Sequence, residues 1–285
     1  MTKLRLEVPP SRTRRLIVIE PARRWEIINL REIWGFRDLF YLLMLRDVKL
    51  RYKQTALGIV WVVLQPLVAA LIFAVIFGRF AGLPSGNVPY LPFVFAGLLA
   101  WNLFAGALGR AGNSLLSDSR LISKVYFPRI IIPMASSAAV LVDFAVSLVV
   151  MLGLLVAFQI PFTWNLLTLP FWLGLALLNA VGVSLFFSAL NVYYRDFSYA
   201  LPFVIQVWMY ASPVVYSADL IPGPLKSVYA INPIVGVIDG FRWALLGAGE
   251  FPLLTAAISL ALGIALLIAG GLVFSRVENS FADVI

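Results

Sequence analysis

Few side chains in this 285-residue sequence could serve as an acid, a base, a nucleophile or a metal ligand. It contains no cysteine and no histidine, which excludes disulfides, thiol nucleophiles, catalytic triads built on imidazole, and zinc or haem ligation through those side chains. It also lacks a Gly-x-x-x-x-Gly-Lys-Ser/Thr segment, so it cannot bind ATP through a phosphate loop. Any ATP is therefore expected to be hydrolysed by a partner, and we expect neither a metal site nor a cofactor in this chain.

One carboxylate, Asp143, lies within the long apolar segments that could form membrane helices, where the other ionisable side chains are tyrosines. An aspartyl protease would need a second carboxylate beside it, and an ion-coupled carrier usually needs several buried acids. We therefore expect a structural role for Asp143, either protonated or hydrogen-bonded to a serine or asparagine of a neighbouring helix. A role in transport is the alternative.

A polar and aromatic face could bind sugars. Tyr199, Phe203, Gln206 and Tyr210 recur at intervals of four, three and four residues, so they share one face of a helix. Sugar rings expose C–H faces that stack on aromatic rings, and their hydroxyl groups need amide or hydroxyl partners. This face predicts a conduit for sugars, and Trp61 with Gln65 forms a smaller pair of the same kind. The alternative is that these aromatics pack against helices or lie at the membrane interface.

The composition places these residues in a membrane. Hydrophobic residues make up 61% of the chain and charged residues only 13%, and the mean hydropathy is +0.94. A soluble protein of this size needs about twice that share of charge to cover its surface. We predict an all-α integral membrane domain over residues 54–275, with six spans at about 54–78, 90–108, 133–158, 166–190, 197–218 and 251–275.

The basic residues predict the orientation. Six spans put both termini on one side, and that side carries 19 of the 22 lysines and arginines. The other side carries only Arg79, Lys226 and Arg242. The positive-inside rule then places both termini in the cytoplasm, as a basic tail over residues 1–24 and a C-terminal segment over residues 276–285. The net charge of +8 follows from this topology, and nucleic-acid binding is not expected because no nucleic-acid motif accompanies it.

Two cytoplasmic segments could contact a partner. Residues 25–53 mix apolar and charged side chains, which predicts an amphipathic helix at the interface, and Arg46, Lys49 and Arg51 near its end could form a docking surface. Those cations could instead only contact lipid phosphate. In the loop over residues 112–129, Ser117 or Asp118 can cap a short helix whose exposed apolar residues would form a peg for a partner. That helix contains Arg120, Leu121, Ile122, Lys124 and Val125, and Pro128 ends it. A solvated connector is the alternative.

A third segment, residues 219–250, lies on the outer side. Asn232 followed by Pro233 predicts a helix start, and Asp239 and Arg242 lie three residues apart, where they can pair. The apolar stretch is too short to span a bilayer. We therefore predict short re-entrant helices between the fifth and sixth spans.

Five segments in order resemble the permease of a type-2 ABC exporter, in the branch that exports polysaccharides such as O-antigen, capsule or teichoic acid. The resemblance covers the chain from about residue 25 onward. The segments are 45–67, beginning Leu-Arg-Asp-Val-Lys-Leu-Arg-Tyr-Lys; 124–129, Lys-Val-Tyr-Phe-Pro-Arg; 190–197, Leu-Asn-Val-Tyr-Tyr-Arg-Asp-Phe; 208–216, Trp-Met-Tyr-Ala-Ser-Pro-Val-Val-Tyr; and 232–247, beginning Asn-Pro-Ile-Val-Gly-Val-Ile-Asp-Gly-Phe-Arg-Trp.

The resemblance implies a homodimer in the bacterial inner membrane, with a lipid-linked glycan as cargo and a central conduit between the two copies. Two cytoplasmic ATPase subunits would bind the ATP and Mg²⁺. The interface helix and the loop around Asp118 to Lys124 would seat in those ATPases, and the segment with Asn232, Pro233, Asp239 and Arg242 would form an external gate. Other type-2 ABC export, of a drug or small lipid, and a passive channel or scaffold are the alternatives.

Overall fold

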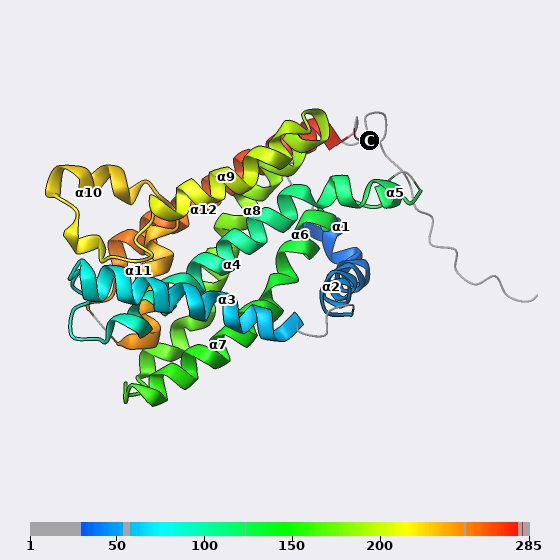
Figure 1. Ribbon diagram of the computed structural model, residues 1–285. Helices are drawn as coiled ribbons and strands as arrows, with labels where there is room; N and C mark the ends of the chain where they lie inside the picture. Colours follow the sequence, from blue (N-terminus) through cyan, green and yellow to red (C-terminus); the bar gives the residue numbers. More distant parts are fainter. Residues whose placement is uncertain (1–29, 54–57, 123, 248, 279–280, 282–285) are drawn as a thin grey trace, which may run out of the picture.

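The computed structural model describes residues 30–53, 58–122, 124–247, 249–278 and 281 (Figure 1). Its regular elements are all helical, and the described residues form no strand. The predicted basic tail over residues 1–24 lies outside the described residues, as do 25–29 of the interface helix and most of the C-terminal segment. The all-α membrane fold is confirmed.

Five helical stretches are long and apolar enough to cross a membrane, counting only the described residues. They are Val60–Phe80, Tyr90–Ser117, Ile131–Ala157, Trp164–Tyr193 and Leu253–Glu278. The first joins α3 (Gly58–Phe73) to a π-helical turn, η1 (Ala74–Phe80); the second is α4 (Tyr90–Ser117); the third joins α6 (Ile131–Ala138) and α7 (Val140–Ala157); the fourth joins η2 (Trp164–Thr168) and α8 (Leu169–Tyr193); the fifth is α12 (Leu253–Glu278).

The fifth predicted span is shorter than expected. We predicted a span over residues 197–218, but the helix there, α9 (Asp196–Tyr210), has 15 residues and ends in a turn at Ala211. At 1.5 Å per residue its length is about 22 Å, which is less than the roughly 30 Å of a hydrocarbon core. The count of six spans therefore stays a prediction. Beyond α9 come the short helices η3 (Ala218–Leu220), α10 (Gly223–Ala230) and α11 (Val235–Leu246).

Helix α4 lies at the centre of the bundle, and it is longer than the predicted span. It runs to Ser117, although we expected the membrane helix to end at about residue 108 and a loop to begin at residue 112. In its most apolar stretch 78% of the residues are buried, against 11% in the first membrane helix. It contacts α3, α6, α7, α8, α9 and α11. Helix α4 therefore positions the helices that pack around it. Helix α3, in contrast, has a largely uncovered surface.

Small residues set the spacing between α8 and α12, which pack along each other. A Cβ atom at Gly270 would overlap the carbonyl oxygen of Gly182, and one at Gly263 would lie 2.9 Å from the amide oxygen of Asn179. In a membrane, small residues at a helix crossing let two backbones approach closely enough to gain van der Waals contact. The pair α8 and α12 is thus a rigid part of the scaffold.

The predicted interface helix is two helices, α1 (Leu30–Gly35) and α2 (Arg37–Tyr52), with a turn at Phe36. They lie at the end of the bundle where α5 (Ser119–Ile122) and the last described residues are found, opposite the end that carries α10 (Figure 1). Leu43 is buried in a small apolar cluster with residues of α6, α8 and α12, whereas Trp34, Leu42 and Leu50 are exposed. Helix α2 therefore contacts the bundle through Leu43 and leaves several apolar side chains uncovered. An amphipathic helix at the membrane interface stays a prediction.

Candidate transport path and coupling surfaces

The four residues of the predicted sugar face are all exposed on α9. The exposed fractions are 84% for Tyr199, 68% for Phe203 and 64% for Tyr210, and Gln206 between them is exposed as well. On the opposite side of the helix, Leu201 is fully buried, and its methyl group is so close to α4 that a Cβ atom at Gly112 would lie 2.6 Å from it. The aromatic face is therefore not part of the core of this chain.

The second predicted pair, Trp61 and Gln65, is also exposed, on α3. Helices α3 and α9 both contact α4 and lie on either side of it in the view of Figure 1. The chain therefore presents two uncovered faces with aromatic and amide side chains, held by the same central helix.

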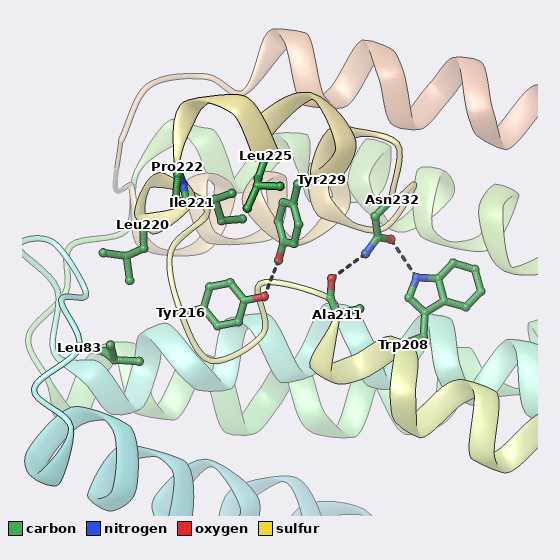
Figure 2. A pocket seen from close by; sticks show the side chains of 10 residues that line it. All are labelled: Leu83, Trp208, Ala211, Tyr216, Leu220, Ile221, Pro222, Leu225, Tyr229 and Asn232. Carbon is green, nitrogen blue, oxygen red and sulfur yellow. Dashed lines mark hydrogen bonds between the residues drawn. The ribbon is translucent and has the colours of Figure 1, made fainter.

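An apolar cavity of about 760 Å³ opens beyond the end of α9, and the sequence analysis did not predict it. Figure 2 shows its walls, which come from the turn after η1, the last turn of α9 and the segment up to Asn232. Two hydrogen bonds organise it: the hydroxyls of Tyr216 and Tyr229 are 2.9 Å apart, and the Trp208 indole N–H donates to the Asn232 Oδ1 over 2.9 Å. The lining residues are Leu83, Trp208, Ala211, Tyr216, Leu220, Ile221, Pro222, Leu225, Tyr229 and Asn232.

Asn232 joins the segment just before α11 to the end of α9. Besides the Trp208 bond, its amide nitrogen donates to the Ser212 hydroxyl over 2.9 Å and to the Ala211 carbonyl over 3.2 Å. Its Oδ1 also accepts from the backbone N–H of Ile234 over 3.3 Å, which is an Asx turn. With Pro233 following, α11 begins at Val235, three residues later than Asn232. The predicted helix start is thus correct to within a few residues. The Asn232 side chain also links this segment to α9 through its hydrogen bonds.

Arg242 is a buried cation, with only 5% of its surface exposed. Its guanidinium lies 3.7 Å from the centre of the Phe93 ring and donates to the carbonyls of Val214 over 2.8 Å and Tyr216 over 3.1 Å. Buried charge of this kind is stable when every donor has a partner and an aromatic face adds a cation–π contact. Arg242 therefore holds the loop after α9 against α4. Its pairing with Asp239 stays a prediction.

The short helix that was predicted as an exposed peg is partly buried. Ile122 is 5% exposed and packs in the small apolar cluster under α2, and Leu121 is partly buried against the same cluster. The expectation that these two side chains are exposed is wrong for Ile122, because the α4 helix continues to Ser117 and turns the short helix α5 inward. The predicted peg also included Val125, which follows α5 and is 51% exposed, and the next residue, Tyr126, is 65% exposed.

Two charged residues of the predicted coupling surface bind each other. Arg46 on α2 donates to Asp118 over 2.6 Å and to Asp47 over 2.8 Å, and Asp47 accepts a bond of 2.7 Å from the Ser136 hydroxyl on α6. Burial lowers the pKa of Arg46, but the hydrogen bonds to Asp118 and Asp47 outweigh burial and raise that pKa above its ordinary value. Of the other cations, Lys49, Arg120 and Lys124 have exposed side chains.

Asp143 has partners that the sequence analysis missed. Its carboxylate accepts hydrogen bonds from the Tyr52 hydroxyl and the Arg110 guanidinium, and Arg51 lies 3.2 Å away. The expected partner, a serine or asparagine, is wrong: the donors are the Tyr52 hydroxyl and the Arg110 guanidinium, and Arg51 forms an ion pair. Burial and the bond to Asp143 raise the pKa of Tyr52 to about 12. One sequence signal could have indicated the pairing with Arg110. Arg110 directly follows the charge-free stretch 80–109, and Asp143 directly precedes the charge-free stretch 144–194, so each lies at the end of an apolar segment.

The end of α12 anchors the segment after α5. The backbone N–H of Arg129 donates to Glu278 Oε1 over 2.8 Å, its guanidinium donates to the Glu278 carbonyl, and Phe281 is fully buried in the cluster under α2. Local sequence patterns do not predict this contact, because the two residues are 149 positions apart.

A family model described as ABC-2 type transporter matches residues 38–246. The chain is 29% identical over 259 residues to the O-antigen export system permease protein RfbA of Myxococcus xanthus, covering 89% of this chain and 98% of that protein. It is 27% identical over 252 residues to the protein of the same name in Klebsiella pneumoniae, covering 87% and 95%. It is 26% identical over 210 residues to the inner membrane transport permease YadH of Escherichia coli strain K12, covering 69% and 80%.

These matches agree with the geometry. The matched family segment contains nearly all of α2, the central helix α4, the aromatic face on α9 and helix α11. The helical bundle supplies several helices of membrane-spanning length. By sequence and by architecture, this chain is a multi-pass membrane protein and a transport subunit of the ABC-2 type transporter family.

Proposed function

We propose that the chain is the transmembrane subunit of an ATP-driven exporter that moves a lipid-linked polysaccharide, such as O-antigen, across the inner membrane. Two copies would form the conduit between them, and two cytoplasmic ATPase subunits would bind ATP and Mg²⁺. Relatives in Myxococcus xanthus and Klebsiella pneumoniae are named as O-antigen export permeases and align over almost their whole length. These relatives support a polysaccharide as the class of cargo.

The observation that carries the proposal is the exposed face on α9. In a single chain, Tyr199, Phe203 and Tyr210 leave large aromatic surfaces uncovered, and Gln206 on the same face offers an amide donor and acceptor. An apolar helix that merely contacted lipid would gain little from an amide at that position. Rings for stacking and an amide for hydroxyl groups suit a polymer of sugars that must slide along the face without tight binding.

The ATPase subunits would bind at the end of the bundle that carries α1, α2 and α5. This end exposes apolar side chains such as Trp34, Leu50 and Tyr126 beside the cations Lys49 and Lys124. An exposed mixture of apolar and basic groups is typical of a protein interface core with a polar rim. Positive charge on the cytoplasmic side also anchors the helix to anionic lipid headgroups.

The direct test uses inside-out membrane vesicles that contain the chain and its ATPase subunit. The vesicles are loaded on the outside with radiolabelled lipid-linked O-polysaccharide, and glycan that becomes protected from an added glycosidase is measured with ATP. We expect protection that requires ATP and disappears when the ATPase lacks its phosphate-loop lysine. ATP-dependent uptake of a dye or a short-chain lipid without glycan would favour other ABC-2 export, and ATP-independent protection would indicate a passive channel.

A further inference from the structure

We infer that Asp143 is the positioning residue that joins the cytoplasmic helix α2 to the membrane helices α4 and α7. The inference rests on the proposed function, because it assigns a route by which an ATPase seated on α2 would move the conduit. The observation behind it is that the Asp143 carboxylate contacts three side chains on two other helices. It accepts hydrogen bonds from Tyr52 and Arg110 and forms an ion pair with Arg51.

The geometry of this joint is specific. The Asp143 Oδ1 accepts from the Tyr52 hydroxyl, and the Oδ2 accepts from the Arg110 guanidinium and lies 3.2 Å from Arg51. Tyr52 is the last residue of α2, Arg110 belongs to the central helix α4, and Asp143 lies in the first turn of α7. Only 15% of the Asp143 side chain is exposed, and 23% of Arg110.

The position of the joint in the chain matters as much as its bonds. Helix α2 ends at Tyr52 and α3 begins at Gly58, so the joint lies where the cytoplasmic helix passes into the first membrane helix. Helix α3 carries Trp61 and Gln65, and it contacts both α4 and α7. A displacement of α2 would therefore reach the α3 face and α4 together, as long as Asp143 holds Tyr52 and Arg110 at one point.

The joint does not act alone, but it is the contact in which one carboxylate on α7 meets side chains of both α2 and α4. One turn earlier on α2, Asp47 accepts from the Ser136 hydroxyl on α6, and Arg46 binds Asp118 after α4. These contacts hold α2 to the ends of its neighbours. Asp143 is different because its charge balances Arg110 within α4 itself, and a guanidinium that loses its carboxylate in a partly buried site is unfavourable.

The test compares Asp143→Asn, Asp143→Glu and Tyr52→Phe in the complete permease–ATPase complex. The control is Asp38→Asn, also on α2, because the Asp38 side chain is 93% exposed and its arginine neighbour lies 3.9 Å away. The first measurement is the ratio of glycan moved to ATP hydrolysed. We expect Asp143→Asn to lower it about tenfold, since a charge-assisted hydrogen bond is worth on the order of a factor of ten in an equilibrium.

We expect Asp143→Glu to restore most of that ratio, Tyr52→Phe to lower it less than Asp143→Asn, and Asp38→Asn to leave it unchanged. Complexes of all variants should still contain the ATPase. A ratio that Asp143→Asn leaves unchanged would overturn the inference. An Asp143→Glu variant as impaired as Asp143→Asn would also overturn it, because a positioning carboxylate should be replaceable by a longer one.

The second measurement needs no cargo. The native chain has no cysteine, so spin labels can be placed on Leu42→Cys in α2 and Val149→Cys in α7, which are 63% and 69% exposed. For the distance between the two labels within one chain, we expect a narrow distribution in the unaltered joint and a broad one with Asp143→Asn. A narrow distribution in that variant would refute the joint. If the unaltered complex moves no glycan, the proposed function fails, and the spin labels still decide whether Asp143 holds α2.

Discussion

Arg46 on helix α2 donates a hydrogen bond of 2.6 Å to Asp118, the residue that follows the end of α4, although the two residues are 72 positions apart in the sequence. The Asp118 side chain is 14% exposed and that of Arg46 is 36% exposed. Two segments that were each expected to face the ATPase are therefore connected directly. An ATPase subunit that moved one of them would move the other.

That connection gives the first prediction. In a double-mutant cycle, Arg46→Ala and Asp118→Asn should each destabilise the permease, and the coupling free energy between them should be about 1 kcal/mol, the upper part of the range for partly exposed ion pairs. The measurement is thermal unfolding in detergent of both single variants and the double variant. The pair Arg37–Asp38, 3.9 Å apart and largely exposed, serves as the control and should couple by close to zero. Additive effects for Arg46 and Asp118 would contradict the direct contact.

The second prediction separates folding from docking after α4. Ile122→Asp should destabilise the permease by several kcal/mol, because it buries a carboxylate in an apolar cluster. Val125→Asp with Tyr126→Asp should leave the melting temperature nearly unchanged, since both side chains are exposed, and should abolish co-purification of the ATPase. Retention of the ATPase with full coupling in the second variant would mean that these residues do not contact it.

The third prediction concerns the α9 face. Phe203→Ala and Tyr210→Ala should lower polymer export in cells with little change in melting temperature, because both rings are exposed and their removal opens no core. Trp172, which is fully buried, is the control for packing, and its replacement by alanine should cost about 3–5 kcal/mol. Trp164→Ala, at an 86% exposed site outside this face, should change neither property. Normal export in both α9 variants would assign their rings to lipid.

A fourth prediction tests the close packing of α11 on α8. A Cβ atom at Gly240 would overlap the indole ring of Trp172, so Gly240→Ala should lower the melting temperature and the yield of folded protein. The matched control is Gly174→Ala in α8, where a Cβ atom meets nothing within 4 Å and alanine favours the helix by about 1 kcal/mol. Equal stability of the two variants would show that α11 does not seat on Trp172.

The fifth prediction tests topology by labelling single cysteines in the cysteine-free chain. Cysteines at Ser85 and at Trp164, which is 86% exposed, should react with an impermeant thiol reagent from outside. A cysteine at the exposed Ser117 should react only after the membrane is permeabilised. One at Ser280 should behave like Ser117 if the spans number six. External labelling at Ser280 would require an odd number of crossings.

Much of the architecture follows from the amino-acid sequence alone. Charge-free stretches longer than a bilayer core cannot remain in water, so they predict membrane helices without any tertiary information. The motif order and the missing phosphate loop likewise indicated the family and the need for a partner ATPase. The periodicity of Tyr199, Phe203 and Tyr210 placed these residues on one face, because the helical repeat is a local property.

Helix ends and side-chain partners needed the tertiary structure. The sequence could not show that α4 continues to Ser117 or that Ile122 turns inward, because apolar residues beside charges fit either an exposed peg or a buried turn. It also could not pair Asp143 with Arg110 and Tyr52, which are 33 and 91 positions away. Electrostatic partners are chosen by how helices pack, and packing brings together residues that no local pattern relates. The sequence therefore predicted which stretches are apolar enough to form membrane helices, and the tertiary structure decided where those helices end and which charges meet.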